Sequence, residues 1–473
     1  MTRKRTLSAA LATTASVALL AGLSPAQAQM GGTPGGPCST TLESPAMMNC
    51  TLPSSKAPGA GSFPGSFLVP GTTTSFAVHG LIQMDIAHNL GPNTYDGSLA
   101  PPLEGAAGHS ENGGTFLNSA PTRPNIETRT PTAYGELKTY IEFDFGETNN
   151  STYGNSSPST NALGNSNTVQ NPGNQGVARL RQAYGTLGPF LAGQTKTLFD
   201  DPAEYPDIAD AGLEAGMRTS TIVHRPQVRY TYLAGNGITV AGSLEMPTKN
   251  VIGVYSAGAA SPTAVTGDGA GSISTSSIVQ IPDAVLAAQW DQPWGHLKLA
   301  GTYHESIIDN VGTGTFANTA GNRSEVPGYA FHLSGHVNAW GKDALRGEVQ
   351  YDKGIASDNS SMSDDRLVGA GGYRGTISAL SGDANYEHFF SSQWRSNISA
   401  GISRSTVSTP TTAPNGLAAV NGTVWTGHVN VIYSPVPQTD FITEVQHETI
   451  HELGGSYQTG KVTRLYEQFK FYF

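Results

Sequence analysis

Hydrophobic and polar positions alternate along this chain in short runs, from Phe76 to the C-terminus. In FAVHGLIQMDIAH (76–88), the apolar positions alternate with His79, Gln83 and Asp85. ELKTYIEFDF (136–145) has the same period of two, which predicts β-strands because successive strand side chains point to opposite faces. The pattern recurs in ARLRQAYGTL, QVRYTYL, AVLAAQW, HLKLAGTYHE, AFHLSGHVNAW, ALRGEVQYD, SNISAGISR, GHVNVIYS and DFITEVQHE.

The connections between these runs alternate between short and long. Short ones fall at 130–136, 291–296, 340–344 and 434–439, and long Gly/Asn/Ser/Thr-rich ones at 146–176, 250–280, 306–328 and 404–421. This is typical of a transmembrane antiparallel β-barrel of the outer membrane, with short periplasmic turns and long outer loops. A soluble β-sandwich would not alternate its connections so consistently. The barrel is expected over 76–473, which is 473 − 76 + 1 = 398 residues, and about 25 residues per strand and connection predicts about sixteen strands.

Two segments are expected before the barrel: one that is removed on export and one that remains. Residues 1–28 have a basic start, an apolar stretch and Ala26-Gln27-Ala28, which predicts a secretory signal peptide. A membrane anchor is the weaker interpretation, because the apolar stretch is short and interrupted by Thr and Ser. Residues 29–75 form a Gly/Pro-rich periplasmic segment. Cys38 and Cys50 in this segment are expected to form a local disulfide, as in many exported proteins.

Charge narrows the possible partners. Asp and Glu outnumber Lys and Arg by 36 to 26, which argues against nucleic acid as a partner.

The last strand alternates through Phe469, Phe471 and Phe473, and a terminal Phe resembles the signal read by the outer-membrane assembly machinery. Glu467 falls on the lipid side of this strand, which is costly unless a neighbouring subunit or the membrane interface covers it.

One motif suggests a metalloprotease. VQHETIHELGG (445–455) contains H-E-x-x-H, which binds zinc when a helix places both histidines on one face. Here the motif continues an alternating strand, where residues four apart are about 13 Å apart. One zinc ion with nitrogen ligands at about 2.0–2.1 Å cannot join them. We therefore expect neither an enzyme nor a cofactor or metal.

Several stretches resemble the DcaP-type trimeric porins: ETRTPTAYGELKTYIEFDF, RLRQAYGTLGPFLAGQTKTLFDD, RPQVRYTY, IPDAVLAAQWDQPWGHLKLAG, WGKDALRGEVQYDKGI and NVIYSPVPQTDFITE. The resemblance implies a sixteen-stranded homotrimeric barrel whose third outer loop folds inward, and diffusion of small, mostly anionic solutes such as dicarboxylates. Family members often carry an N-terminal coiled coil, which the segment with Cys38 and Cys50 replaces here.

The expected pore site combines a basic wall with an acidic loop. If Leu180 and Tyr184 face lipid, Arg179 and Arg181 face the lumen, where neighbouring strands add the polar residues Gln194 and Gln227. The other expected solute-binding residues are Lys138, Tyr140, Lys196, Arg225 and Arg229. The expected constriction loop, 198–224, carries Asp200, Asp201, Glu204, Asp207 and Asp210. Opposed charges would select and orient solutes, although the arginines can also serve only to anchor the loop.

The sequence thus predicts a porin in the outer membrane of a Gram-negative bacterium. Its expected partners are outer-membrane lipid, lipopolysaccharide, small anionic solutes, the assembly machinery and two further copies of the chain. Two other classes remain open: a structural or adhesive barrel, which channel conductance would distinguish, and a secreted enzyme, which membrane fractionation would exclude.

Overall fold

The computed structural model describes residues 59–91, 93–94, 109–110, 113–147, 177–209, 223–247, 252–255, 275–278, 281–310, 323–355, 366–369, 372–407, 420–453 and 459–473. All of them belong to one compact unit, Pro37–Phe473. The expected signal peptide, Cys38, Cys50 and Asp210 lie outside the described residues. Among the residues described, no helix combines the length and the hydropathy needed to cross a membrane.

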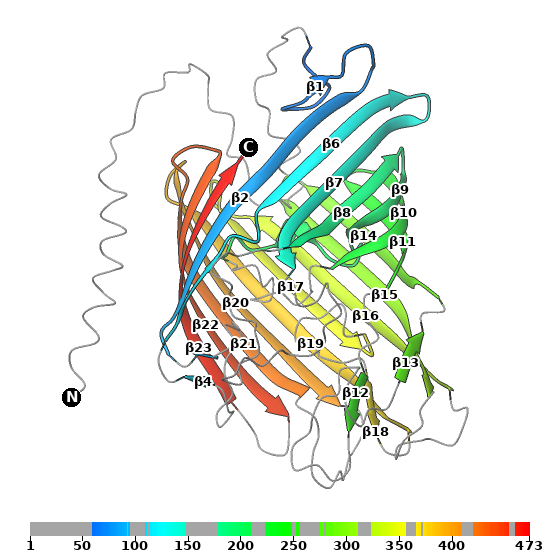
Figure 1. Cartoon of the computed structure of the whole chain (residues 1–473), viewed down its shortest axis with the longest axis vertical. Helices are drawn as coiled ribbons and strands as arrows, with labels where there is room; N and C mark the ends of the chain where they lie inside the picture. The colour runs from blue at the N-terminus through cyan, green and yellow to red at the C-terminus, as the bar shows by residue number, and fades with distance from the viewer. Residues whose placement is uncertain are drawn as a thin grey trace, which may run out of the picture. The chain divides into compact units, whose positions relative to one another are not determined.

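The unit is a closed antiparallel barrel of sixteen strands, as predicted (Figure 1). Each strand pairs with its neighbour along the chain, and β2 pairs with β23 to close the ring. The barrel strands are β2 (Ser75–Asn89), β6 (Arg123–Thr132), β7 (Gly135–Glu147), β8 (Val177–Leu187), β9 (Phe190–Lys196), β10 (His224–Gly235), β11 (Ile238–Glu245), β14 (Asp283–Gln292), β15 (Gly295–Asn310), β16 (Arg323–Asn338), β17 (Ala344–Lys353), β19 (Gly372–Phe389), β20 (Trp394–Val407), β21 (Val420–Tyr433), β22 (Thr439–Leu453) and β23 (Thr459–Tyr472).

Shorter strands accompany the ring. β1 (Phe67–Leu68) pairs with the start of β2, and β5 (Thr115–Asn118) continues the ladder of β6 along β2. β13 (Thr275–Ile278) pairs with β15, while β12 (Ile252–Tyr255) and β18 (Arg366–Gly369) form a parallel pair between two long connections. β3 (Asn93–Thr94) and β4 (His109–Ser110) form a separate hairpin.

Short and long connections lie at opposite ends of the barrel, as the sequence predicts. The short turns lie at the top of Figure 1 with the C-terminus, and the strand ends that the long connections join lie at the bottom. The described part of the N-terminal segment contacts the first strands: the Ser62 amide donates to Ser75 Oγ (2.8 Å), and the Arg129 guanidinium lies 4.6 Å from the Phe63 ring centroid.

Side chains alternate across the wall. On β14, Asp283 and Val285 point inward and are buried, whereas Leu286 points outward with 64% of its surface exposed. β22 likewise directs Glu444 and Gln446 inward and Val445 outward. An apolar outside and a polar inside suit a barrel that spans lipid around an aqueous lumen.

β22 also contains the H-E-x-x-H motif, which therefore lies on a strand and not on a helix. As predicted, His447 and His451 lie on an extended strand. Both side chains are exposed, and His447 Nδ1 lies 2.8 Å from Thr463 Oγ1. A helical zinc-protease site is therefore not formed.

The terminal aromatic strand closes the barrel. The Phe473 amide donates to the Gly80 carbonyl (3.0 Å), and the Gly80 amide donates back to the Phe473 carbonyl (2.9 Å). Phe469 and Phe471 both pack on Phe441, with ring centroids 5.7 and 6.0 Å away. The last strand is thus part of the ring, because an unpaired edge would leave backbone groups without partners in the membrane.

Candidate functional site

The arginines of β8 share acidic partners on β7. Arg179 donates from Nε and Nη2 to both carboxylate oxygens of Asp144 (2.9 and 2.6 Å), and Arg181 donates from Nη1 to Asp144 Oδ2 (2.8 Å). Arg181 Nε also lies 3.7 Å from Glu142 Oε1. The Arg179 side chain is 38% exposed and that of Arg181 only 2%. Arg179 is therefore the more exposed of these two arginines.

A β-bulge in β8 changes one expectation. Glu142 pairs with Gln182, but Phe143 pairs with Leu180, so Arg181 is the additional residue. Leu180 points outward, as predicted. The prediction that Tyr184 faces lipid is wrong, because the bulge shifts the alternation by one residue. Tyr184 points inward, with its ring centroid 5.5 Å from that of Tyr140.

Lys138 belongs to an aromatic and acidic group on β6–β8. Its Nζ lies 3.3 Å from Glu127 Oε2 and 5.5 and 5.9 Å from the ring centroids of Tyr140 and Tyr184. Tyr140 donates to Glu142 Oε2 (2.8 Å). Lys138 and Tyr140 thus lie together on the inner face, and carboxylates accompany the cation.

The cations of β9 and β10 differ in their partners. Arg225 is fully buried, with Nη1 3.2 Å from Asp283 Oδ2 and 3.9 Å from Glu245 Oε2. Arg229 donates instead to two neutral acceptors, Gln227 Oε1 (2.9 Å) and the Lys196 carbonyl (2.8 Å). Among the described residues, no carboxylate oxygen lies within 4.0 Å of its guanidinium.

Lys196 and Gln194 contact neighbouring parts of the chain. Lys196 Nζ lies 5.1 Å from the Tyr205 ring centroid, a cation–π contact with the acidic loop. Gln194 donates to the carbonyls of Leu180 and Arg181 (2.9 and 3.2 Å), so it bonds to backbone groups at the bulge.

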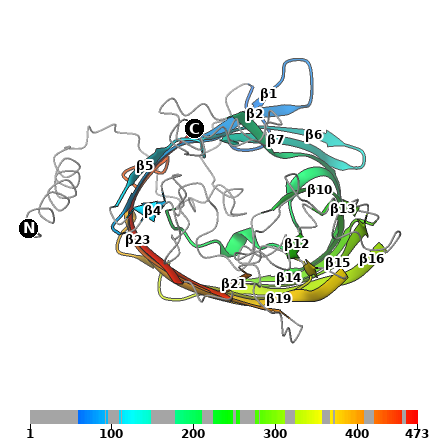
Figure 2. The same ribbon diagram turned by 60° about the horizontal axis from the view of Figure 1, so that its bottom comes forward.

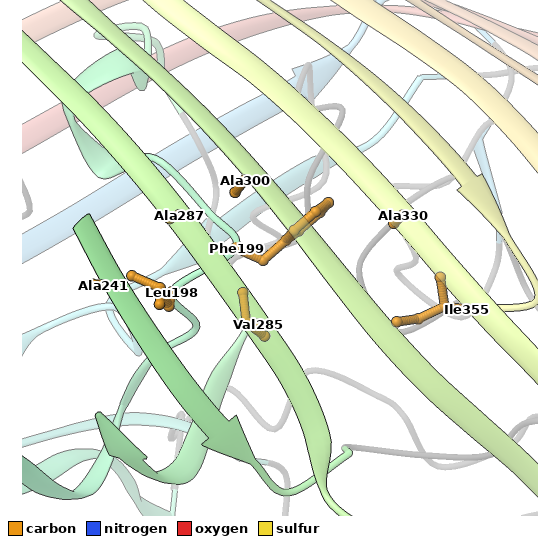
Figure 3. Packing of buried hydrophobic residues seen from close by; sticks show 8 residues of the cluster. All are labelled: Leu198, Phe199, Ala241, Val285, Ala287, Ala300, Ala330 and Ile355. Carbon is orange, nitrogen blue, oxygen red and sulfur yellow. The ribbon is translucent and has the colours of Figure 1, made fainter. Parts of the chain in front are cut away.

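Residues 197–209, the described start of the acidic loop, follow the inner wall. Figure 2 shows this green segment within the ring of strands. Leu198 and Phe199 pack on inward-facing residues of β11 and β14–β16, four of them alanines that leave room for the loop (Figure 3). The cluster consists of Leu198, Phe199, Ala241, Val285, Ala287, Ala300, Ala330 and Ile355. Burial of this apolar surface holds the loop to the wall.

The loop carboxylates pair with strands other than β8. Asp201 Oδ2 lies 3.0 Å from His296 Nε2 and accepts a hydrogen bond from Ser334 Oγ (2.5 Å). Glu204, in the 3₁₀ turn η2 (Pro202–Glu204), places Oε1 2.7 Å from His336 Nδ1. Asp200 accepts from the Tyr205 hydroxyl, and its carbonyl accepts from Lys298 Nζ.

The loop continues to a second part of the inner wall, formed by β20–β22. Asp207 Oδ2 lies 2.6 Å from Arg395 Nη2 on β20, and the Asp207 carbonyl accepts from Asn430 Nδ2 (2.7 Å). The Ala209 amide donates to Glu444 Oε2 (2.8 Å). Among the described residues, the loop is thus bonded to β15, β16 and β20–β22, and its acids are not bonded to Arg179 or Arg181.

Burial and hydrogen bonding act differently on two of these acids. Burial alone would raise the pKa of Asp201, but hydrogen bonding to His296 and the charge of Lys298 outweigh it and hold that pKa below its usual range. Burial raises the pKa of Glu204, and the bond to His336 offsets only part of this effect.

Sequence reasoning missed the residues that receive the loop. These are His296, Lys298, His332, His336 and Arg395. His332, for example, places Nδ1 3.0 Å from the Phe199 carbonyl oxygen. Their signal is visible in HLKLAGTYHE and AFHLSGHVNAW, where histidine and lysine take the polar positions of two adjacent strands.

An apolar outer wall, a polar inner wall and a loop bonded across the inside define a membrane channel. Comparison with known proteins agrees: a family model described as "Porin subfamily" matches residues 63–452, and the chain belongs to this family. Porin Omp2a of Brucella melitensis is 26% identical over 315 residues, which cover 61% of this chain and 77% of that protein.

A solved structure supports the fold. The outer membrane channel DcaP of Acinetobacter baumannii superposes with a TM-score of 0.63 at 17% sequence identity, covering 88% of this chain and 100% of that one. The chain is therefore an outer-membrane channel of a Gram-negative bacterium, and the family and fold indicate a channel rather than an enzyme.

Proposed function

We propose that this channel is a homotrimeric porin for passive diffusion of small hydrophilic solutes, with a preference for anions such as dicarboxylates. The observation that carries the proposal is the inner wall, where polar and charged side chains occupy the inward positions of strand after strand. Such a wall replaces part of the hydration of a polar solute, whereas an apolar lumen would not.

Arg229 supports the anion preference. Its guanidinium bonds to neutral oxygens, so its charge remains uncompensated by a directly bonded carboxylate among the described residues. Arg179 is accessible but shares Asp144 with Arg181, and Arg181 and Arg225 are buried in ion pairs. We therefore assign solute contact to Arg229 first and Arg179 second, and a structural role to Arg181 and Arg225.

The interaction energy between a pore cation and a solute carboxylate sets the size of the expected change in permeability. A cation about 4 Å from a carboxylate contributes about 4 kcal/mol at an effective dielectric constant of about 20. Desolvation of both partners reduces the net effect to about 1 kcal/mol, equivalent to a severalfold change in permeability ratio. A dicarboxylate has two charges and gains more than a monocarboxylate if it reaches both Arg229 and Arg179.

The test is the reversal potential of purified protein in planar bilayers under a salt gradient. We expect Arg229→Gln to lower the anion-to-cation permeability ratio severalfold and to slow succinate uptake more than uptake of a neutral sugar. Arg404→Gln is the matched control, because Arg404 is exposed on the outward face of β20. Equal reversal potentials for the two folded variants would contradict the assignment.

The alternative is a structural or adhesive barrel without solute preference. Stepwise conductance by purified wild-type protein would exclude it, and a folded protein that never conducts would support it instead of the porin.

A further inference from the structure

One group of side chains has no role in the solute pathway proposed above. It lies where the loop meets β15 and β16 and comprises Asp201, Glu204 and His296. Each offers one ligand atom, and these atoms all lie within 4.8 Å of one another. We propose that Asp201, Glu204 and His296 form a binding site for a divalent transition-metal ion that ties the loop to the barrel wall.

An unpartnered oxygen is the first reason. Glu204 is 3% exposed, and its buried Oε2 has no hydrogen-bond partner among the residues that the structure describes, although Oε1 is bonded to His336. A buried carboxylate oxygen that accepts no hydrogen bond is costly. A cation held between Glu204 and Asp201 would supply the missing interaction.

His296 is already oriented as a ligand. Its Nδ1 lies 2.6 Å from Asp291 Oδ1, and its Nε2 lies 3.0 Å from Asp201 Oδ2. A carboxylate on the far nitrogen is the usual outer partner of a metal-binding histidine, since it fixes both the ring and the tautomer. A metal ion would take the place of the proton on Nε2.

The charges of the site favour a divalent cation. Asp200, Asp201, Glu204 and Asp291 contribute four negative charges, and the Lys298 ammonium contributes one positive charge, so the sum is −4 + 1 = −3 with neutral imidazoles. Lys298 Nζ donates to the Asp200 carbonyl, and Ser334 Oγ donates to Asp201. A divalent ion therefore offsets most of this negative charge without displacing Lys298.

The donor set selects the metal. One imidazole nitrogen and two carboxylate oxygens suit Zn²⁺, whereas Ca²⁺ and Mg²⁺ prefer oxygen ligands alone. At bond lengths of about 2.0–2.1 Å, tetrahedral ligand atoms lie about 3.3 Å apart, so the group has to contract slightly. The His336 ring stacks on His296 with centroids 5.8 Å apart, and its side chain is 22% exposed, so the group borders on solvent.

The experiment is titration of metal-stripped, full-length protein in detergent with ZnCl₂, followed by isothermal calorimetry. We expect one Zn²⁺ per chain, at least tenfold weaker binding in Glu204→Gln and in His296→Gln, and little heat with CaCl₂. Glu204→Gln keeps an oxygen for His336 and nearly the same volume, so folding can be verified by heat-modifiable migration on gels.

The control is His447→Ala/His451→Ala, which removes two exposed histidines on the outer face of β22. This variant should bind Zn²⁺ like the wild type. Absence of binding in the wild type, or unchanged binding in folded Glu204→Gln, would overturn the site. Loss of binding in the β22 variant would assign the zinc to adventitious histidines.

Discussion

At the scale of residues, the turn between β16 and β17 offers a pH-dependent test. Hydrogen bonds from the Tyr386 hydroxyl and the Phe389 amide, with His388 nearby, lower the pKa of Asp343 to about 2. A carboxyl with a depressed pKa contributes stability above its unfolded pKa of about 3.9 and loses it as the pH falls through its folded value. We expect Asp343→Asn to melt at a lower temperature than wild type at pH 7, with the difference shrinking between about pH 4 and pH 2. A difference that stays constant over this range would contradict the role of the charge.

Single residues also show where sequence reasoning stops. The alternation places Lys138, Tyr140 and Arg179 on the inner face correctly, because side-chain direction follows from period two. It fails for Tyr184, because one additional residue at Arg181 shifts the alternation, and the glycine of that strand, Gly185, lies four residues beyond the bulge and does not mark it. The sharing of Asp144 by two arginines depends on the pairing of β7 with β8 near that bulge, which composition does not specify.

At the scale of elements, closure of the ring depends on a small residue opposite the C-terminus. A Cβ at Gly80 would lie 2.4 Å from the Phe473 ring and 2.9 Å from the Arg123 carbonyl oxygen. The ring can rotate away, but the carbonyl belongs to the paired strand β6. We expect Gly80→Ala to destabilise the barrel by about 1–3 kcal/mol, as in other overpacked sites, measured by urea unfolding in detergent.

Gly427→Ala is the matched control, because that glycine also faces outward, on β21. Within the described part of the chain, only the Ser399 carbonyl oxygen, at 4.0 Å, lies near its missing Cβ. If both alanine variants unfold at the same urea concentration, contact with the terminal phenylalanine does not limit closure.

The elements themselves were predictable, whereas their long-range contacts were not. Strands and turns follow from local pattern and length, so the sixteen-stranded ring is visible in the sequence. The parallel pair β12–β18 joins two connections more than 100 residues apart, and its strands have only four residues each. The acidic loop was expected to face the arginines of β8, but Leu198 and Phe199 fit against small residues of β11 and β14–β16. That fit depends on the shape of the closed barrel.

At the scale of the whole molecule, the outer surface is not uniform. Opposite the apolar β14–β16 wall, the outward faces of β22, β23, β2 and β5 carry hydrogen-bonded polar pairs: Thr443 with Glu467, His447 with Thr463 and His88 with Thr115. Polar and charged groups are costly against lipid tails. We therefore expect this outer polar face to be covered by a neighbouring copy in the proposed trimer.

A matched pair of bulky substitutions tests this expectation. Thr443 donates to Glu467 Oε2 (2.8 Å) on the outer polar face, whereas Ala288 points outward on β14 beside the exposed Leu299. A tryptophan facing lipid adds favourable apolar surface, but one placed in a packed subunit interface forces the copies apart. We expect Thr443→Trp to lower the melting temperature of the trimer band in semi-native electrophoresis and to release folded monomers, while Ala288→Trp leaves the band unchanged. If both variants keep wild-type trimer melting, β22 and β23 face lipid. The hydrogen bond to Thr443 would then be what stabilises the Glu467 carboxylate against lipid.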